Sequence, residues 1–375
     1  MRSFRLPAAG ALALTLFVSA CASGGAPSPT TAPAAATTAP AKPAAASPAA
    51  ASSSPSPAAS PSPAAGAAAS PKPAASPAAS PSLAASPSPA ASPVAAGGPK
   101  PTVKMGSANF PEQVILGELY AQILEANGYT VERHLNLGSR EVVAPALQSG
   151  QIDMYPEYLA TAEAFFANKA GSQSKATSDP TATQQALQAL LTPQNLTVLD
   201  YAQAIDTNGF VVTKQTADKF HLAKLSDVQP VAGQMILGGP PECPERPFCQ
   251  VGLRETYGLN FKDFKALDPG GPLTVAALDS GDIDIGLLFT TDPNITLKSY
   301  TLLEDDKHLQ LADNIAPVIR DQVLQQGSDL RQLANSVSAK LTTSDLTDMN
   351  KSVGIDHQDA SAVAKAYLQK QGLLH

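Results

Sequence analysis

Two stretches of the chain end in aromatic and hydroxyl side chains that could hold a small molecule. The first, residues 146–161, delivers Tyr158 and Thr161. The second, residues 277–292, repeats its opening pattern Ala-Leu-x-Ser-Gly-x-Ile-Asp-apolar and ends with Phe289 and a Thr-Thr-Asp segment. An enzyme would need a nucleophile beside a base, and we find no Ser, Cys or Lys so placed in these segments. The residue types therefore predict a binding protein without catalytic residues, and not an enzyme.

The two stretches share a local structure that would position these side chains. In each, a helix with Ala-Leu on its buried face stops at a glycine, Gly150 or Gly281, and a short apolar strand follows. Glycine accepts the positive φ that ends a helix. The aromatic side chain then lies just past the carboxyl end of the strand, where ligands bind in open α/β sheets. This repeat predicts two similar lobes with a ligand between them, although such junctions are also common in α/β proteins generally.

Two other segments carry polar groups suited to a ligand. Asn109 precedes an amphipathic helix at residues 114–127, whose exposed amide groups would suit an anionic or polar group; simple helix capping is the alternative. Cys243 and Cys249 have five residues between them, which in an exported protein predicts a disulfide. The short loop would aim Arg246 at a ligand, or else serve as a structural staple with Arg246 solvated.

Residues 102–375 alternate strand-like and helix-like segments, which predicts an α/β fold. The expected strands are residues 102–107, 130–137, 152–155, 198–201, 209–212, 235–239, 264–267, 301–303 and 315–319. The expected helices are residues 114–127, 140–149, 160–191 with interruptions, a helix start within 222–228, 272–280 and a helical tail at 330–374.

Composition excludes several function classes. The net charge of −7 argues against nucleic acid as a partner, because its binding proteins carry a basic stripe. No glycine-rich phosphate loop is present, and the five histidines stand apart from one another and from the cysteines. We therefore expect no metal and no cofactor.

The first 101 residues read as an export signal and a tether. Residues 1–20 combine Arg2 and Arg5 with a short apolar run, as in a signal peptide. The Val-Ser-Ala-Cys sequence resembles the bacterial lipobox, which implies cleavage before Cys21 and attachment of lipid there; a plain secretory signal is the alternative. Residues 21–101 follow as the lipidated cysteine and a disordered linker of Ala, Pro and Ser, which serves as a spacer or is a tolerated insert.

The motifs of residues 102–375 resemble those of the glycine betaine, carnitine and choline binding proteins of ABC importers. The matching segments are Gly-Ser-x-Asn-Phe-x-Glu-Gln from Gly106, Ser-Gly-x-Ile-Asp-x-Tyr-Pro-Glu-Tyr from Ser149, Tyr-Gly-Leu from Tyr257, and Thr291-Asp292. The resemblance implies a two-lobed type II periplasmic-binding-protein fold with a ligand cleft and two hinge crossings. It also implies a small quaternary-ammonium (osmoprotectant) or other cationic solute as ligand.

The resemblance assigns roles to individual residues. Tyr158 and Phe289 match rings of an aromatic cage, in which cation–π attraction holds the ammonium group. Thr161 and Arg246 match donors to the ligand carboxylate, and Asp206 matches an acidic residue beside the cation.

The chain also departs from the family pattern. Ala108 replaces a frequent lysine, Asn208 replaces a ring, and Asp313-Asn314 stands where relatives often have a tyrosine. With no Trp in the chain, we expect weaker or altered ligand choice, with the cation met by Asp206 and Asp313.

These inferences combine into one expected mechanism. A lobe formed by residues 102–206 and 309–375 closes on a lobe formed by residues 207–308 and traps the ligand. We expect a monomer, anchored by lipid on the extracytoplasmic face of the membrane, that delivers its ligand to an ABC permease and its ATPase. The alternative is a ligand-sensing or adhesion lipoprotein of the same fold without a transporter.

Overall fold

The computed structural model describes residues 100–374. The predicted signal peptide, the predicted lipidation site Cys21 and all but the last two residues of the predicted linker fall outside the described residues.

The first of two five-stranded sheets has the order β2-β1-β3-β10-β4. Its strands are β1 (Thr102–Gly106), β2 (Thr130–His134), β3 (Met154–Tyr158), β4 (Leu196–Val198) and β10 (Ile315–Arg320). β1 pairs in parallel with β2 and β3, whereas β10 runs antiparallel to β3 and β4. The late strand β10 thus returns the chain to the sheet in which it began, as the sequence predicts.

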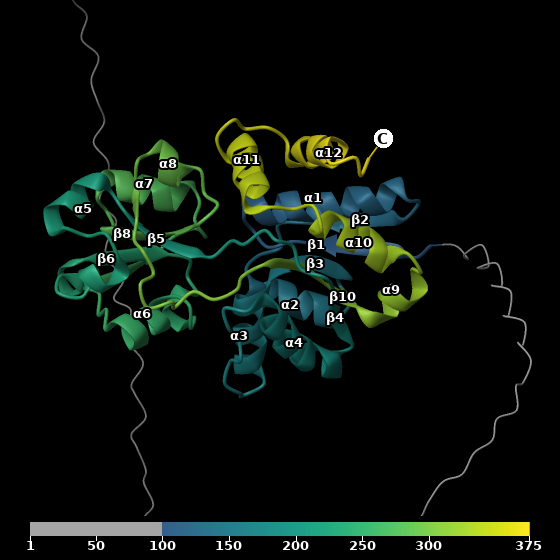
Figure 1. Ribbon diagram of the computed structural model, residues 1–375, viewed down its shortest axis with the longest axis horizontal. Coiled ribbons are helices and arrows are strands. Elements are labelled where there is room, and N and C mark those ends of the chain that lie inside the picture. The colour runs from purple at the N-terminus through teal and green to yellow at the C-terminus, as the bar shows by residue number, and fades with distance from the viewer. Residues whose placement is uncertain (1–99, 375) are drawn as a thin grey trace, which may run out of the picture. The chain divides into compact units, whose positions relative to one another are not determined.

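Helices cover both faces of this sheet (Figure 1). On one face lie α1 (Pro111–Ala126), α10 (Leu330–Ser338), α11 (Thr343–Gly354) and α12 (Ala360–Lys370). On the other lie α2 (Arg140–Gln148), α3 (Leu159–Lys169) and α4 (Pro180–Leu191), while α9 (Asp321–Gln326) follows β10. We call this sheet with its helices the first lobe.

The second sheet has the order β7-β6-β8-β5-β9. Its strands are β5 (Asn208–Val212), β6 (Ile236–Gly239), β7 (Asp263–Ala266), β8 (Ile285–Phe289) and β9 (Thr301–Leu302). Its helices are α5 (Lys214–Phe220), α6 (Gln250–Tyr257), α7 (Pro272–Ser280) and α8 (Asn294–Leu297). Single 3₁₀ turns occur at Leu225–Val228, Ala232–Gln234 and Cys243–Glu245, and one in the first lobe lies between α4 and β4 at Thr192–Gln194. We call the second sheet with its helices the second lobe.

The repeated sequence pattern corresponds to equivalent places in the two lobes. α7 ends directly before Gly281 and α2 ends two residues before Gly150; both glycines have positive φ, 75° and 76°, and β8 and β3 follow. The aspartate of each repeat then accepts a hydrogen bond from the backbone of the neighbouring parallel strand. Asp153 receives the Lys104 amide at 3.0 Å, and Asp284 receives the Ile236 amide at 2.8 Å. The repeated residues therefore have a structural role: the glycine follows the end of a helix, and the aspartate links the next strand to its parallel neighbour.

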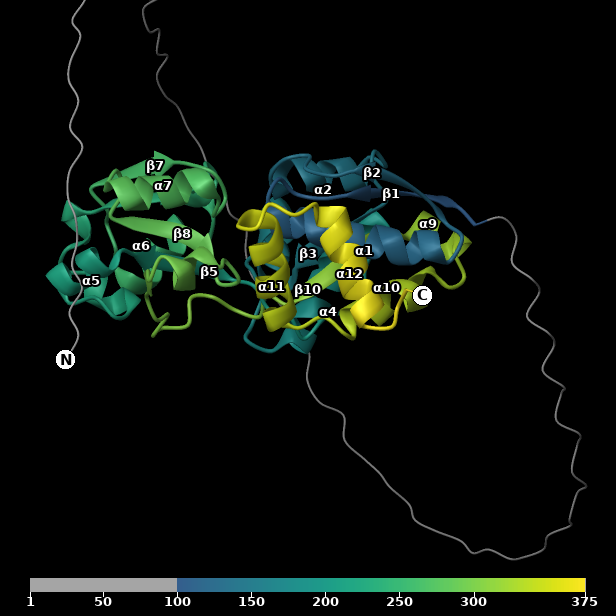
Figure 2. The same ribbon diagram turned by 90° about the horizontal axis from the view of Figure 1, so that it is seen from above.

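Two chain segments run between the lobes (Figures 1 and 2). They pair as a short antiparallel bridge between Ile205 and Asn314, and the Asp206 amide donates to the Asp313 carbonyl at 3.2 Å. The two crossing segments thus lie next to each other between the lobes, with Asp206 of one beside Asp313 of the other.

The structure corrects some of the predicted element bounds. β3 continues to Tyr158, so that this residue ends the strand instead of following it. The strand expected at residues 198–201 lies earlier, at β4, where residues 196–198 pair with β10. The helix start expected within residues 222–228 is only a single 3₁₀ turn.

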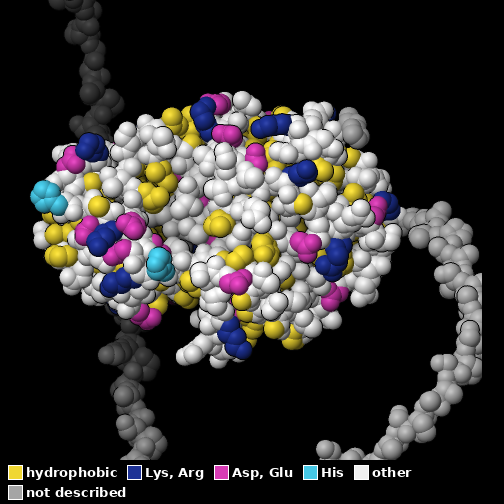
Figure 3. Space-filling view, viewed as in Figure 1, with side chains coloured by type: hydrophobic (Ala, Val, Ile, Leu, Met, Phe, Trp, Pro, Cys, Tyr) yellow, Lys and Arg dark blue, Asp and Glu magenta, His cyan; other side chains and the backbone are white. Residues whose placement is uncertain are grey.

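Among residues 100–374, no helix is both long enough and apolar enough to cross a bilayer. On the face shown in Figure 3, basic and acidic side chains are interspersed and neither kind gathers into a stripe.

Candidate functional site

A cavity of about 440 Å³ is lined by residues of both lobes and of the crossings. This volume lies within the range typical of small-molecule sites. All of the side chains predicted to bind ligand line it: Asn109, Tyr158, Thr161, Asp206, Arg246, Phe289 and Asp313. The sequence therefore located residues that the fold gathers around one space, although they are spread over more than half of the described chain.

Aromatic rings from both lobes meet at this cavity. The ring of Phe110, the residue before α1, lies 6.2 Å from that of Tyr158 and 4.8 Å from that of Phe289, between centroids. Phe248 also lines the cavity. Ring faces of this kind attract a cation electrostatically. The sequence reasoning missed Phe110 and Phe248 as site residues, and the position of Phe110 next to Asn109 was a usable signal.

The departure at Asn208 has a structural reason. Its side-chain amide donates to the carbonyl of Phe248 at 3.0 Å, and the amide of Gln310 donates to the same carbonyl at 3.0 Å. At the position where the sequence predicted a missing ring of the cage, this chain thus holds Phe248 in place through its backbone carbonyl.

Asp206 belongs to a buried acidic cluster beside the cavity. It accepts the hydroxyl of Thr290 and the amide of Thr291, each at 3.0 Å. Burial raises the pKa of Asp206 well above its usual value, and the nearby carboxylate of Glu112 raises it further. The pKa of Glu112 is also raised, again chiefly by burial, against the hydrogen bonds that it receives. A cation in the cavity would favour ionisation of Asp206.

Glu112 ties this cluster to Tyr158. It does not line the cavity, but it accepts the Tyr158 hydroxyl at 2.8 Å. The ring of Tyr158 is thereby fixed in orientation with its edge turned to a buried acid.

The other acid at the crossings, Asp313, binds Thr161. It accepts the Thr161 amide at 2.8 Å and lies 3.3 Å from the Thr161 hydroxyl. Burial raises its pKa to about 7, although these hydrogen bonds and the Arg140 guanidinium act in the opposite direction.

Arg140 is a third site residue that the sequence reasoning missed. At the start of α2, it donates two hydrogen bonds of 2.7 Å to Glu157 and one of 2.9 Å to the Thr161 hydroxyl. Its side chain and that of Glu157 are 12% and 2% exposed. Its place at the beginning of a predicted helix resembled ordinary surface charge, so nothing in the sequence marked it as buried.

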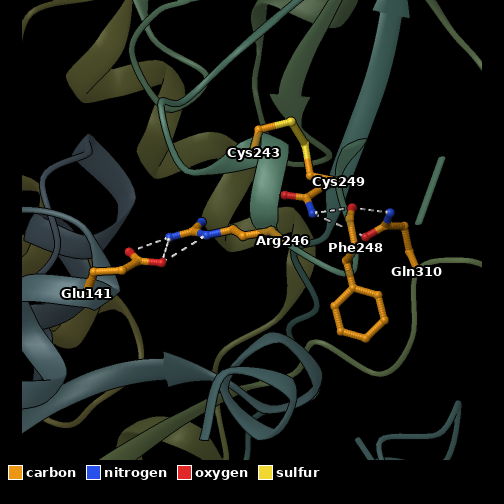
Figure 4. Close-up of a disulfide and its surroundings, with 7 residues drawn as sticks. Glu141, Cys243, Arg246, Phe248, Cys249 and Gln310 are labelled. Carbon is orange, nitrogen blue, oxygen red and sulfur yellow. Dashed lines mark hydrogen bonds and ion pairs between the residues drawn. A yellow bond between two sulfur atoms is a disulfide. The ribbon is translucent and has the colours of Figure 1, made fainter. Parts of the chain in front are cut away.

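Arg246 is carried by the disulfide loop (Figure 4). Cys243 and Cys249 are bonded, with their Cα atoms 5.2 Å apart. From this loop in the second lobe, Arg246 reaches Glu141 of α2 in the first lobe, with an Nη2 to Oε2 distance of 2.9 Å. The predicted carboxylate-binding arginine thus already contacts a carboxylate of the protein.

Comparison with known proteins agrees with this geometry. Residues 101–370 match the family described as the substrate binding domain of ABC-type glycine betaine transport system. The chain belongs to this family. Its relatives are substrate-binding proteins of transporters and not enzymes.

Individual members of the family cover most of this chain. The glycine betaine-binding protein YehZ of Escherichia coli (strain K12) is 27% identical over 279 residues, which are 72% of this chain and 90% of that protein. The glycine-betaine-binding protein of Pseudomonas aeruginosa is 27% identical over 284 residues, which are 73% of this chain and 89% of that protein.

Solved structures agree on the fold of this substrate-binding protein. The crystal structure of a glycine betaine/carnitine/choline ABC transporter is 23% identical and superposes with a TM-score of 0.58. It covers 72% of this chain, and this chain covers 99% of it. The chain therefore has the two-lobed α/β fold of periplasmic binding proteins, with a cleft where the lobes meet.

Proposed function

We propose that this substrate-binding protein captures a small quaternary-ammonium or related cationic solute and delivers it to an ABC permease and its ATPase. The observation that carries the proposal is the meeting of Phe110, Tyr158 and Phe289 at a cavity that is also lined by Asp206. Rings attract the cation through their faces, each by about 0.5–2 kcal/mol, and a carboxylate adds charge complementarity. The relatives from Escherichia coli and Pseudomonas aeruginosa are glycine betaine-binding proteins, which supports the same ligand class.

The ligand would be trapped by closure about the two crossings. We assign residues 102–206 and 309–375 to one moving body and residues 207–308 to the other. The pairing of Ile205 with Asn314 supports a hinge there, because few residues would need to change their backbone angles. Hydrogen bonds and an ion pair between the lobes would form on closure.

We further propose that the protein acts as a monomer on the extracytoplasmic face of the membrane, held by lipid on Cys21. The lipobox-like sequence supports this assignment, and residues 21–101 would serve as the tether. Labelling of cells with a lipid precursor tests it: the Cys21→Ala variant should lose the label.

Titration calorimetry on the purified chain tests the ligand class. Glycine betaine, choline and 3,3-dimethylbutan-1-ol, the uncharged carbon analogue of choline, form the panel. We expect at least one of the two charged ligands to bind, and the uncharged analogue to bind at least about tenfold more weakly than choline, because it lacks the attraction to rings and carboxylates. Absence of binding by both charged ligands, or equal binding of the uncharged analogue, would contradict the proposal.

A further inference from the structure

The guanidinium of Arg246 is already occupied at the cavity wall. Its Nε lies 3.4 Å from Oε1 of Glu141, and its Nη2 lies 3.2 Å and 2.9 Å from Oε1 and Oε2 of that carboxylate. Burial opposes ionisation of Glu141, but Arg246 and other hydrogen bonds outweigh it and hold the pKa below its usual value. Glu141 is therefore a carboxylate at neutral pH, and it uses the edge of Arg246 that would best receive a ligand carboxylate.

A second carboxylate approaches the same arginine. Oε1 of Glu242 lies 3.7 Å from Nη2 of Arg246. The other oxygen of Glu242 is buried and has no hydrogen-bond partner among residues 100–374. A ligand carboxylate at this place would be the third negative group around one positive charge, and would meet repulsion from both glutamates.

The other two basic residues that line the cavity, Arg140 and Lys169, are not placed to replace Arg246 as the partner of a ligand carboxylate. Arg140 is paired through two hydrogen bonds with Glu157, which is buried. Lys169 is exposed at the cavity rim, with its ammonium group over the ring of Phe165. Each arginine that lines the cavity is thus neutralised by the protein itself, whereas Asp206 and Asp313 form no ion pair with a basic side chain of residues 100–374.

We propose that Glu141 is a specificity-determining residue that fills the anion subsite of the cavity, so that the protein selects cations without a carboxylate over zwitterions. A choline-like ligand would place its ammonium group among the rings and its hydroxyl among neutral donors. A betaine-like ligand would have to displace Glu141 from Arg246 or leave its own carboxylate unpaired, and either alternative costs affinity. This inference rests on the proposed function and narrows its ligand class.

The test compares choline and glycine betaine by titration calorimetry on the full chain, on Glu141→Gln and on Glu132→Gln. Glu132 on β2 is exposed and does not line the cavity, so its variant controls for the lost charge. In the unaltered protein, choline should bind at least about tenfold more tightly than glycine betaine. Glu141→Gln should shift the ratio of the two affinities about tenfold toward glycine betaine, because it frees Arg246. The ratio is the readout because loss of the ion pair between the lobes would act on both ligands alike. The control should leave the ratio unchanged.

A second variant protects the test against a misfolded protein. Glu242→Gln, from the other glutamate beside Arg246, should shift the ratio in the same direction by a smaller factor, and thermal unfolding confirms that each variant folds. The inference alone is overturned if the unaltered protein binds glycine betaine as tightly as choline or more tightly. It is also overturned if the ratio of choline affinity to glycine betaine affinity is unchanged in folded Glu141→Gln. If Glu141→Gln does not fold, the same ratio in folded Glu242→Gln decides. Failure of both ligands to bind the unaltered protein overturns the proposed function and the inference with it.

Discussion

The hydroxyl of Thr291 donates a hydrogen bond of 2.7 Å to the carboxylate of Glu112, and both residues are buried. Thr291 follows β8 of the second lobe, whereas Glu112 belongs to α1 of the first. Asn350 of α11 donates to the same Glu112 oxygen at 2.7 Å and to the Thr291 hydroxyl at 3.0 Å. The late helix α11 thus supports a contact between the two lobes.

Removing that hydroxyl should weaken the closed form. Thr291→Val keeps the side-chain shape but deletes a hydrogen bond to a buried acid, which contributes about 1 kcal/mol. In the proposed mechanism ligand binding is coupled to closure, so the affinity for the cognate cation should fall about fivefold, as measured by calorimetry. Thr130→Val, at an exposed strand position, is the matched control and should bind normally. Unchanged affinity in Thr291→Val would mean that this contact does not support closure.

The buried acid Asp313 makes stability depend on pH. Its folded pKa of about 7 lies above the usual aspartate value, so the folded protein holds a proton that the unfolded chain has lost. Between about pH 4 and pH 7, stability should therefore fall as pH rises, by about 1.4 kcal/mol per pH unit for this group. Asp206 contributes in the same direction.

Urea unfolding at several pH values measures this dependence. Asp313→Asn keeps an oxygen for the Thr161 amide but cannot ionise, so its stability should fall less steeply with pH over the same window. Parallel profiles for the two proteins would show that Asp313 does not hold a proton in the folded state.

Tyr158 combines a ring with a hydrogen bond, and two substitutions separate them. Tyr158→Ala removes the ring and should weaken binding of the cation by about tenfold or more. Tyr158→Phe keeps the ring near Phe110 and deletes only the hydrogen bond to Glu112, so its loss should be smaller. Calorimetry on both variants checks the order; equal losses would assign the effect to the hydroxyl instead of the ring.

The sequence predicted the parts of this molecule that local patterns determine. The end of a helix at Gly150 and at Gly281 follows from the positive φ that glycine accepts, and both are observed. The same pattern, used twice, predicted two lobes and the edge at which Tyr158 and Phe289 appear. The spacing of Cys243 and Cys249 pointed to Arg246, and the resemblance to a family then added Asp206; the sequence does not reveal which residues surround either of them.

The sequence could not show which charges pair across long separations. Arg140 is buried against Glu157, and Glu141, its neighbour in the chain, crosses to the other lobe. Both are ordinary residues for the first turn of a helix, and only the arrangement of the two sheets decides their partners. For the same reason, the sequence predicted Arg246 as a residue that binds the ligand carboxylate, and only the structure shows that Glu141 pairs with it.

The pair of Arg140 and Glu157 should be costly to break. Removing one partner leaves the other charge buried, which typically destabilises a protein by about 3–5 kcal/mol. We expect a loss in this range for Arg140→Met, and a smaller loss for the double variant Arg140→Met/Glu157→Gln, because the stranded charge is then gone. Arg254→Met, at an exposed pair, makes the same side-chain change and should cost less than about 1 kcal/mol. Urea unfolding measures all three; a double variant as unstable as Arg140→Met would contradict this account.

The disulfide loop should matter more for binding than for stability. A loop closed between Cys243 and Cys249 is short, so chain entropy assigns the bond about 2 kcal/mol of stability. The loop also holds Arg246 and Phe248 at the cavity, and the amides of Asn208 and Gln310 fix only the Phe248 carbonyl. In the variant with both cysteines changed to serine, we therefore expect only a modest drop in unfolding temperature. Ligand binding should be weaker, and the preference for choline over glycine betaine should be smaller, because Arg246 is no longer held against Glu141. Reduction of the unaltered protein with dithiothreitol should reproduce both effects, and normal selectivity without the bond would show that contacts other than the disulfide position Arg246.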